Sequence, residues 1–285
     1  PEPLGDLLRR ARGARPAALS PAALGGHGGG ASTALESVSM SRVWVLLLTL
    51  LVPPASARQA DFVPILPPAG KDRTHVRGIS GDGAVVVGTT VTNFPNSGSE
   101  AFRWTSASGV TLLGHLPGPG VYSLGHATNA DGSVIVGHSD SSQWPFGEAF
   151  VWTAGGGGGM AGLGSVPGSL GSVALDVTPD GTLVVGYFIH ANNEEEPFRW
   201  TAATGFQSLG GFAGQPIDGV ASATSADGSV VVGSSAMGTK YHAFRWTAQT
   251  GMVSLGFLPK SLGTSGAADV SADGSVVVGT SGLEA

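Results

Sequence analysis

The sequence predicts an all-β repeat array of four-stranded antiparallel units, best matched by a partial β-propeller, with a β-solenoid as the alternative. The main observation is an Asp-Gly pair that recurs five times, at Asp82, Asp131, Asp180, Asp227 and Asp273. The spacings are 49, 49, 47 and 46 residues, close to one propeller blade. Composition agrees, because 47 Gly and 18 Pro alongside 41% apolar residues favour many short strands joined by turns.

Residues 40–57 have the pattern of a cleavable export signal. Met40 is the first Met, Ser41 and Arg42 follow it, and an apolar run then leads to Ala55-Ser56-Ala57. The apolar run, residues 43–52, is shorter than the roughly 20 residues that a membrane span needs. We therefore expect cleavage after Ala57 and a secreted or cell-surface protein. An uncleaved anchor or a buried helix is the alternative.

The remaining residues divide into three parts. Residues 1–39, rich in Ala, Gly, Pro and Arg, are expected to be an upstream or disordered leader outside the fold. Residues 58–78 are expected to form a lead-in strand or linker, and residues 79–285 hold four full repeats and a truncated fifth. The fifth unit reaches Gly279 and then Glu284-Ala285, which align with Glu100-Ala101. We therefore expect an incomplete copy, whose next residues would read Phe-x-Trp.

Charge and cysteine content exclude several kinds of site. The chain has no Cys, so it can form neither disulfides nor thiolate metal sites. The formal net charge of -6 disfavours a sequence-independent grip on nucleic acid phosphates. No segment after the export signal is expected to span a membrane.

Each Asp-Gly pair is predicted to close a hairpin. The tetrad Ser225-Ala226-Asp227-Gly228 has the preferences of a type I turn, with Gly free to take a positive φ. The other four pairs have similar tetrads, so we interpret all five Asp residues as structural turn residues. No Asp-x-Asp-x-Asp-Gly spacing surrounds them, which argues against calcium.

The strands after the turn are predicted to be buried. A β-branched run such as Val230-Val231-Val232-Gly233 indicates a strand covered on both faces. In the Phe-x-Trp strand that follows, Phe and Trp share one face because side chains alternate along a strand. We therefore expect these pairs in the core: Phe102 and Trp104, Phe150 and Trp152, Phe198 and Trp200, Phe244 and Trp246. A fourth strand ends at a Leu-Gly in each unit.

Connection lengths predict a loop face. The second loop of each unit varies in length, whereas the link from Leu-Gly to the next Asp-Gly is nearly constant. In a four-stranded meander both lie at the end opposite the Asp-Gly turns, and such loops commonly carry binding. The aromatic residues expected there are the binding candidates: Phe94, Tyr122, Trp144, Phe146, Phe188 and Tyr241.

The repeat unit resembles the HAF extracellular repeat family, named after the His-Ala-Phe that occurs here as His242-Ala243-Phe244. The S-x-D-G-S-V-V-V-G, A-F-R-W-T and Leu-Gly blocks carry the resemblance over residues 79–285. It implies a bacterial exported or surface protein and no established activity. Glu stands in place of His242 in the other units, at Glu100, Glu148 and Glu196, so this His is not a constant ligand.

No catalytic, phosphate-binding or dinucleotide-binding motif is present, and we predict neither a cofactor nor a metal. His115, His126, His138, His190 and His242 are isolated in sequence. The sequence favours a non-catalytic binding, adhesion or structural module with a glycan or surface protein as partner. The alternative is a secreted propeller-type hydrolase acting on a polysaccharide, which would need carboxylates converging from several units.

Overall fold

A computed structural model of the 285-residue chain describes residues 62–93, 97–155, 159–259 and 261–283. The repeats lie in a compact unit that includes Ile65–Ala285. A second unit, Arg15–Pro64, is described only at residues 62–64. The expected leader and export signal lie outside the described residues. None of the residues that the structure describes forms a helix long and apolar enough to cross a bilayer.

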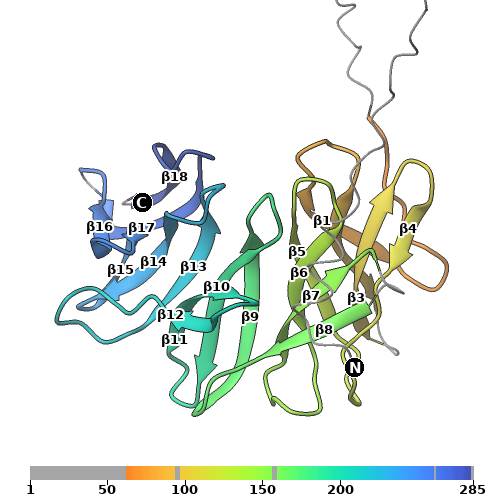
Figure 1. Ribbon diagram of the computed structural model, residues 1–285, viewed down its shortest axis with the longest axis horizontal. Helices are drawn as coiled ribbons and strands as arrows, with labels where there is room; N and C mark the ends of the chain where they lie inside the picture. The colour runs from red at the N-terminus through yellow and green to blue at the C-terminus, as the bar shows by residue number, and fades with distance from the viewer. Residues whose placement is uncertain (1–61, 94–96, 156–158, 260, 284–285) are drawn as a thin grey trace, which may run out of the picture. The chain divides into compact units, whose positions relative to one another are not determined.

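The described residues form β-strands, turns and irregular segments, and Figure 1 shows the strands coloured in chain order. The strands of the first two sheets are β1 Arg73–Ile79, β2 Val86–Thr92, β3 Gly98–Thr105, β4 Gly109–Leu112, β5 Ser123–Thr128, β6 Val134–Ser139, β7 Glu148–Thr153 and β8 Gly159–Gly164. The remaining strands are β9 Ser169–Val177, β10 Leu183–His190, β11 Glu195–Thr201, β12 Gly205–Ser208, β13 Gly219–Thr224, β14 Val231–Met237, β15 Lys240–Thr247, β16 Gly251–Gly256, β17 Ser261–Val270 and β18 Val277–Leu283.

The sheets are antiparallel meanders of consecutive strands: β1–β4, β5–β8, β9–β12, β13–β16 and the pair β17–β18. The first strands β1, β5, β9, β13 and β17 contact one another from sheet to sheet, and their residues line one common cavity. Inner strands gathered around a shared axis are the arrangement of a β-propeller. The predicted all-β array and its partial propeller are thus confirmed. The solenoid alternative is wrong, because each repeat forms its own sheet.

The Asp-Gly turns join the first and second strands. In the fourth sheet, Gly228 N donates to Ser225 O (3.0 Å), while Ser225 Oγ (2.7 Å) and Ser229 N (3.0 Å) donate to Asp227 Oδ1. These hydrogen bonds, led by that from the Ser229 amide, lower the pKa of Asp227 to about 2. Amide and hydroxyl donors likewise reach Asp82, Asp131, Asp180 and Asp273. The carboxylates are thus used within their own turns.

The Phe-x-Trp strands supply the packing between sheets. Phe102, Phe150, Phe198 and Phe244 are all 0% exposed. Trp200 and Trp246 are buried, whereas Trp104 and Trp152 are half-buried. The guanidinium carbon of Arg199 lies 5.1 Å from the centroid of the Trp246 ring in the next sheet, a cation–π distance. Full burial of one such Phe is worth about 1.5–3 kcal/mol.

A β-bulge recurs at one position of every first strand. The register of each first strand against the second skips one residue, five residues before the Asp of the turn. The five extra residues are Arg77, His126, Leu175, Ser222 and Ala268. Such an extra residue is unpaired in the ladder, and its side chain is re-aimed relative to the regular alternation. All five line the common cavity of the first strands.

The Gly that ends each β-branched run is required by close backbone approach. A Cβ on Gly137 would lie 1.9 Å from the carbonyl oxygen of Leu124 on the neighbouring first strand and 3.0 Å from the Phe150 ring. The equivalent Gly of every other unit meets a first-strand carbonyl at 1.9–2.1 Å. The repeated Gly therefore marks where the bulged first strand and the Phe ring close over the second strand.

Candidate functional site

The second loops and the links lie together, as the connection lengths predict. In the second sheet, Ser142 N donates to Pro117 O (3.1 Å), which joins the β6–β7 loop to the link before β5. Asp140 Oδ2 accepts from Val121 N (3.0 Å) and Tyr122 N (3.1 Å) across the same junction. We call residues 117–122 and 140–147 the loop surface. The carboxylate of Asp140 therefore joins the two segments of the loop surface.

A pocket of about 300 Å³ opens in the loop surface, lined by Pro119, Gly120, Asp140, Ser141, Ser142, Gln143, Trp144 and Pro145. Trp144 is half-buried, and its Nε1 has no hydrogen-bond partner among the described residues. Phe146, two residues further on, is 54% exposed, and Tyr122, bound to Asp140, is 45% exposed. An aromatic ring beside carboxylate, hydroxyl and amide groups can bind a ligand that has both flat apolar faces and hydroxyls.

Two of the other aromatic candidates, Phe188 and Tyr241, do not belong to the loop surface. The placement of Phe188 on an exposed loop is wrong. Its side chain is 1% exposed, and its ring centroid lies 4.7 Å from that of Phe198 and 4.9 Å from that of Phe206. The reason is strand alternation: β10 extends through His190, and Phe188 shares the inward face with Val184. Phe94 lies outside the described residues.

Tyr241 belongs to a separate acidic group between the third and fourth sheets. Its hydroxyl donates to Asp218 Oδ2, and Asp218 Oδ1 accepts from Glu195 N at 3.1 Å. The hydrogen bond to Asp218, with burial and the Asp218 charge, raises the pKa of Tyr241 to about 12. Burial, followed by the charge of Asp218, raises the pKa of Glu195. The sequence alone favoured a solvated loop tip at Glu195 and did not single out Asp218, because only the fold brings the start of β11 to the next link.

A second candidate site is the cavity of about 310 Å³ that the first strands enclose, which we call the axial cavity. Its polar lining includes the bulge residues Arg77, His126 and Ser222, together with Asp176 and Asp269, each one position after a bulge, and Thr128. The Arg and His come from the first two sheets, whereas the carboxylates come from the third and fifth. Arg77 therefore brings positive charge to one side of the cavity, and the two carboxylates lie on the other side.

The groups of the axial cavity are constrained by their neighbours. Asp176 Oδ1 accepts from Val177 N (2.8 Å) and Oδ2 from Thr224 N (2.9 Å) in the next sheet. Burial, with a smaller contribution from the charge of Asp269, raises the pKa of Asp176 to about 6 despite these bonds. Burial, with the nearby charges of His138 and Arg77, lowers the pKa of His126 to about 3.

The described residues contain no cluster of three or more His, Asp or Glu side chains that could hold a metal ion. The axial cavity presents hydrogen-bonding groups and charged side chains to a ligand. Sequence reasoning missed it, because a bulge leaves no mark in a pattern of alternating residues.

Comparisons with known proteins give only distant likenesses. No protein-family model and no curated protein matches the chain. Among solved structures, TolB from Acinetobacter baumannii is 15% identical, with a TM-score of 0.47 over 64% of this chain and 42% of that one. A putative TolB from Agrobacterium tumefaciens is 18% identical, with a TM-score of 0.42 over 62% of this chain and 63% of that one. A puromycin hydrolase is 14% identical, with a TM-score of 0.48 over 74% of this chain and 36% of that one.

The chain therefore spans less than two thirds of each of these proteins. The β-propeller assignment given above rests on the strand topology of this chain itself.

Proposed function

We propose that this chain is an exported, cell-surface or extracellular repeat protein of the HAF type that binds a glycan without catalysis. The pocket at Trp144 is the observation that carries this proposal. It combines an indole ring with Asp140, Gln143 and two Ser side chains, and the exposed rings of Tyr122 and Phe146 extend the apolar surface beyond it.

Two features of the pocket favour a polymeric sugar. Sugar rings present flat C–H faces that stack on aromatic rings, while their hydroxyls bind carboxylate and amide groups. Tyr122 and Phe146 lie on segments joined to the pocket, so neighbouring sugar units could contact them in turn. The loop surface is held by backbone hydrogen bonds, which lowers the entropic cost of binding.

A glycan array followed by calorimetry with the best glycan tests the proposal. We expect Trp144→Ala to weaken binding by about tenfold or more, whereas Trp144→Phe should retain most of it because the flat ring remains. Phe257→Ala, which removes an exposed ring outside the pocket, is the matched control. An array without signal, or binding that Trp144→Ala leaves unchanged, contradicts the proposal. If the chain binds a surface protein and no glycan, the ligand is that protein and the glycan proposal is wrong.

A polysaccharide hydrolase is the second candidate, favoured by the two carboxylates in the axial cavity. Both oxygens of Asp176 accept backbone hydrogen bonds, whereas in Asp269 it is Oδ1 that accepts one, from Val270 N (2.7 Å). The exposed Asp269 would therefore carry the acid–base chemistry through Oδ2. An assay of reducing ends released from polysaccharides should then show activity in the wild type and loss in Asp269→Asn. Cleavage that survives this substitution rules out the axial carboxylate mechanism.

A further inference from the structure

The pocket of the loop surface, which we call the Trp144 pocket, has one charged side chain among its lining residues, the carboxylate of Asp140. The two backbone amides that bind this carboxylate, from Val121 (3.0 Å) and Tyr122 (3.1 Å), both donate to Oδ2. This leaves Oδ1 for a ligand. A Cβ on Gly120 would overlap the Asp140 side chain, so the link is shaped to admit the carboxylate. The pocket therefore places a negative charge beside the indole ring.

The repeat itself does not require a carboxylate at this position. Asp140 lies three residues after Gly137, the Gly that ends the β-branched run of its unit. The residues at the same place in the first, third and fourth units are Val91, Ile189 and Ala236. Sheets of this type therefore form with an apolar side chain at this place, and the charge of Asp140 is specific to the second unit and its pocket.

The chain around the pocket supplies no positive charge to balance Asp140. Residues 104–198 contain eight Asp or Glu and no Lys or Arg. In the first unit, Lys71 forms an ion pair with Glu100 (3.0 Å), and Arg77 lines the axial cavity. An acidic sugar in the Trp144 pocket would therefore meet a like charge without a cation among the lining residues.

An ammonium group matches both parts of the pocket. It donates charge-assisted hydrogen bonds to a carboxylate, and it is attracted to the face of an aromatic ring, most strongly to that of Trp. The exposed rings of Tyr122 and Phe146 continue this aromatic surface beyond the pocket. The arrangement therefore favours a ligand that carries amino groups along a chain of flat rings.

We propose that the ligand of the Trp144 pocket is a glycan with free amino groups, a polymer of the glucosamine type rather than one of neutral or acidic sugars. This inference rests on the glycan binding proposed above. One ammonium group donates to Asp140 Oδ1 and lies against the Trp144 ring, while hydroxyls of the same sugar bind Gln143. The adjacent sugar units extend toward Tyr122 and Phe146.

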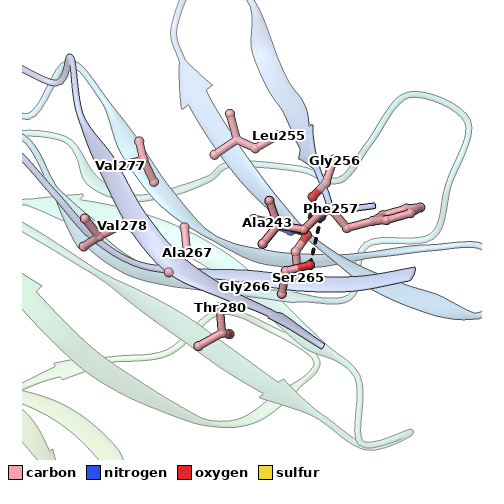
Figure 2. A pocket seen from close by; sticks show the side chains of 13 residues that line it. Ala243, Leu255, Gly256, Phe257, Ser265, Gly266, Ala267, Val277, Val278 and Thr280 are labelled. Atoms are coloured by element: carbon pink, nitrogen blue, oxygen red, sulfur yellow. Dashed lines mark hydrogen bonds between the residues drawn. The ribbon is translucent and has the colours of Figure 1, made fainter. Parts of the chain in front are cut away.

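Another cavity of this chain has an exposed aromatic ring but no charge, and it serves as the comparison. It has a volume of about 340 Å³, lies between the fourth sheet and the β17–β18 hairpin, and includes Phe257, which is 49% exposed. Figure 2 shows its apolar, glycine and hydroxyl-bearing residues. None of the described residues that line it is charged. We therefore expect Phe257→Ala to leave the binding of an amino glycan unchanged.

Calorimetry with two sugars of equal length tests the inference, namely the tetramer of glucosamine and the tetramer of N-acetylglucosamine. Below the pKa of the sugar amines, the glucosamine tetramer should bind about tenfold more tightly, because it alone forms the charged hydrogen bond. Added salt should weaken its binding, because salt screens this interaction. Equal or tighter binding of the acetylated tetramer overturns the inference but leaves glycan binding standing. If neither tetramer binds, the inference is wrong, and the glycan array then decides whether the proposed function fails as well.

Two charge variants locate the interaction. Asp140→Asn keeps an oxygen for the two backbone amides and removes the charge, so it should melt near the wild-type temperature and bind the glucosamine tetramer about tenfold more weakly. Glu194→Gln removes the same charge outside the pocket and should bind as the wild type does. Unchanged affinity in Asp140→Asn contradicts the inference. A tetrapeptide of lysine that binds more tightly than the glucosamine tetramer also contradicts it, since the pocket would then be a site for a basic peptide.

Discussion

His126 on β5 and His138 on β6 stack against each other, with ring centroids 5.3 Å apart and His126 Nε2 3.2 Å from His138 Nδ1. One ring must donate and the other accept, so the contact requires at least one neutral imidazole. Burial lowers the pKa of both rings, and the charge of Arg77 lowers them further, while Asp140 acts in the opposite sense on His138. The pair thus links the wall of the axial cavity to the second strand.

This pair predicts acid sensitivity. The folded chain keeps His126 neutral down to about pH 3, whereas the unfolded chain protonates it near its ordinary value of 6.5. Stability from this group is therefore present above pH 6.5 and is lost as the pH falls below it. His126→Leu, which copies Leu175 of the third unit, should flatten the stability profile between pH 6.5 and pH 4 in urea unfolding. An unchanged profile would show that His126 titrates normally.

Asp176 predicts a pH effect of opposite sign. Its pKa rises from 3.8 to about 6 in the folded chain, so the folded state binds more protons between these values. Stability from this carboxyl is present below pH 3.8 and is lost as the pH rises through 6. Asp176→Asn keeps an amide oxygen that can accept one hydrogen bond and removes the charge. We expect the variant to gain stability relative to the wild type at pH 7 but not at pH 4, as measured by chemical denaturation. A difference independent of pH would contradict this.

The close approach at Gly137 predicts a steric effect. Gly137→Ala would place a Cβ 1.9 Å from the carbonyl oxygen of Leu124, so the first two strands of the sheet must separate. We expect a loss of several kcal/mol, in the range of severe core substitutions. Gly155→Ala, where a Cβ meets nothing within 4 Å, is the matched control and should leave the melting temperature nearly unchanged. Similar melting temperatures for both variants would refute the packing argument.

The Phe residues between sheets predict a large cavity cost. Phe150 is 0% exposed, so Phe150→Ala should cost about 3–5 kcal/mol of unfolding free energy. Phe146→Ala, four residues earlier and 54% exposed, should cost less than about 1 kcal/mol. Urea unfolding of the two variants measures the difference. Equal losses would mean that Phe150 does not carry the junction between the first two sheets.

The export signal predicts the N-terminus of the mature protein. The pattern from Ser41 to Ala57 should direct secretion and cleavage, so that the secreted product begins at Arg58. N-terminal sequencing of the protein from the culture medium or the cell surface checks this. A product that begins at residue 1 or 40 would refute the cleavage site.

The repeat pattern was enough to predict the sheets and their turns. Asp227 and its equivalents form hydrogen bonds only a few residues away in the sequence, and the Phe-x-Trp alternation is set by the strand itself. The pattern did not show whether an aromatic residue near a loop points into the core or to the surface. Phe188 was misplaced because the pattern could not show that β10 continues past Gly186. The pairing of Asp218 with Tyr241 and the axial cavity could not be predicted, since each depends on contacts between residues far apart in the sequence.

Within each repeat, the residues that position the sheets are different from the bulge residue that lines the axial cavity. The second-strand Gly and the Phe-x-Trp strand set the spacing of the sheets, while the bulge residue takes no part in ladder pairing. That one position already holds a cation, an imidazole, an alkyl chain, a hydroxyl and a methyl group. Each of the five bulge residues around the axis can therefore be substituted on its own. The lining of the axial cavity can then change, by evolution or by design, while the sheets keep their structure.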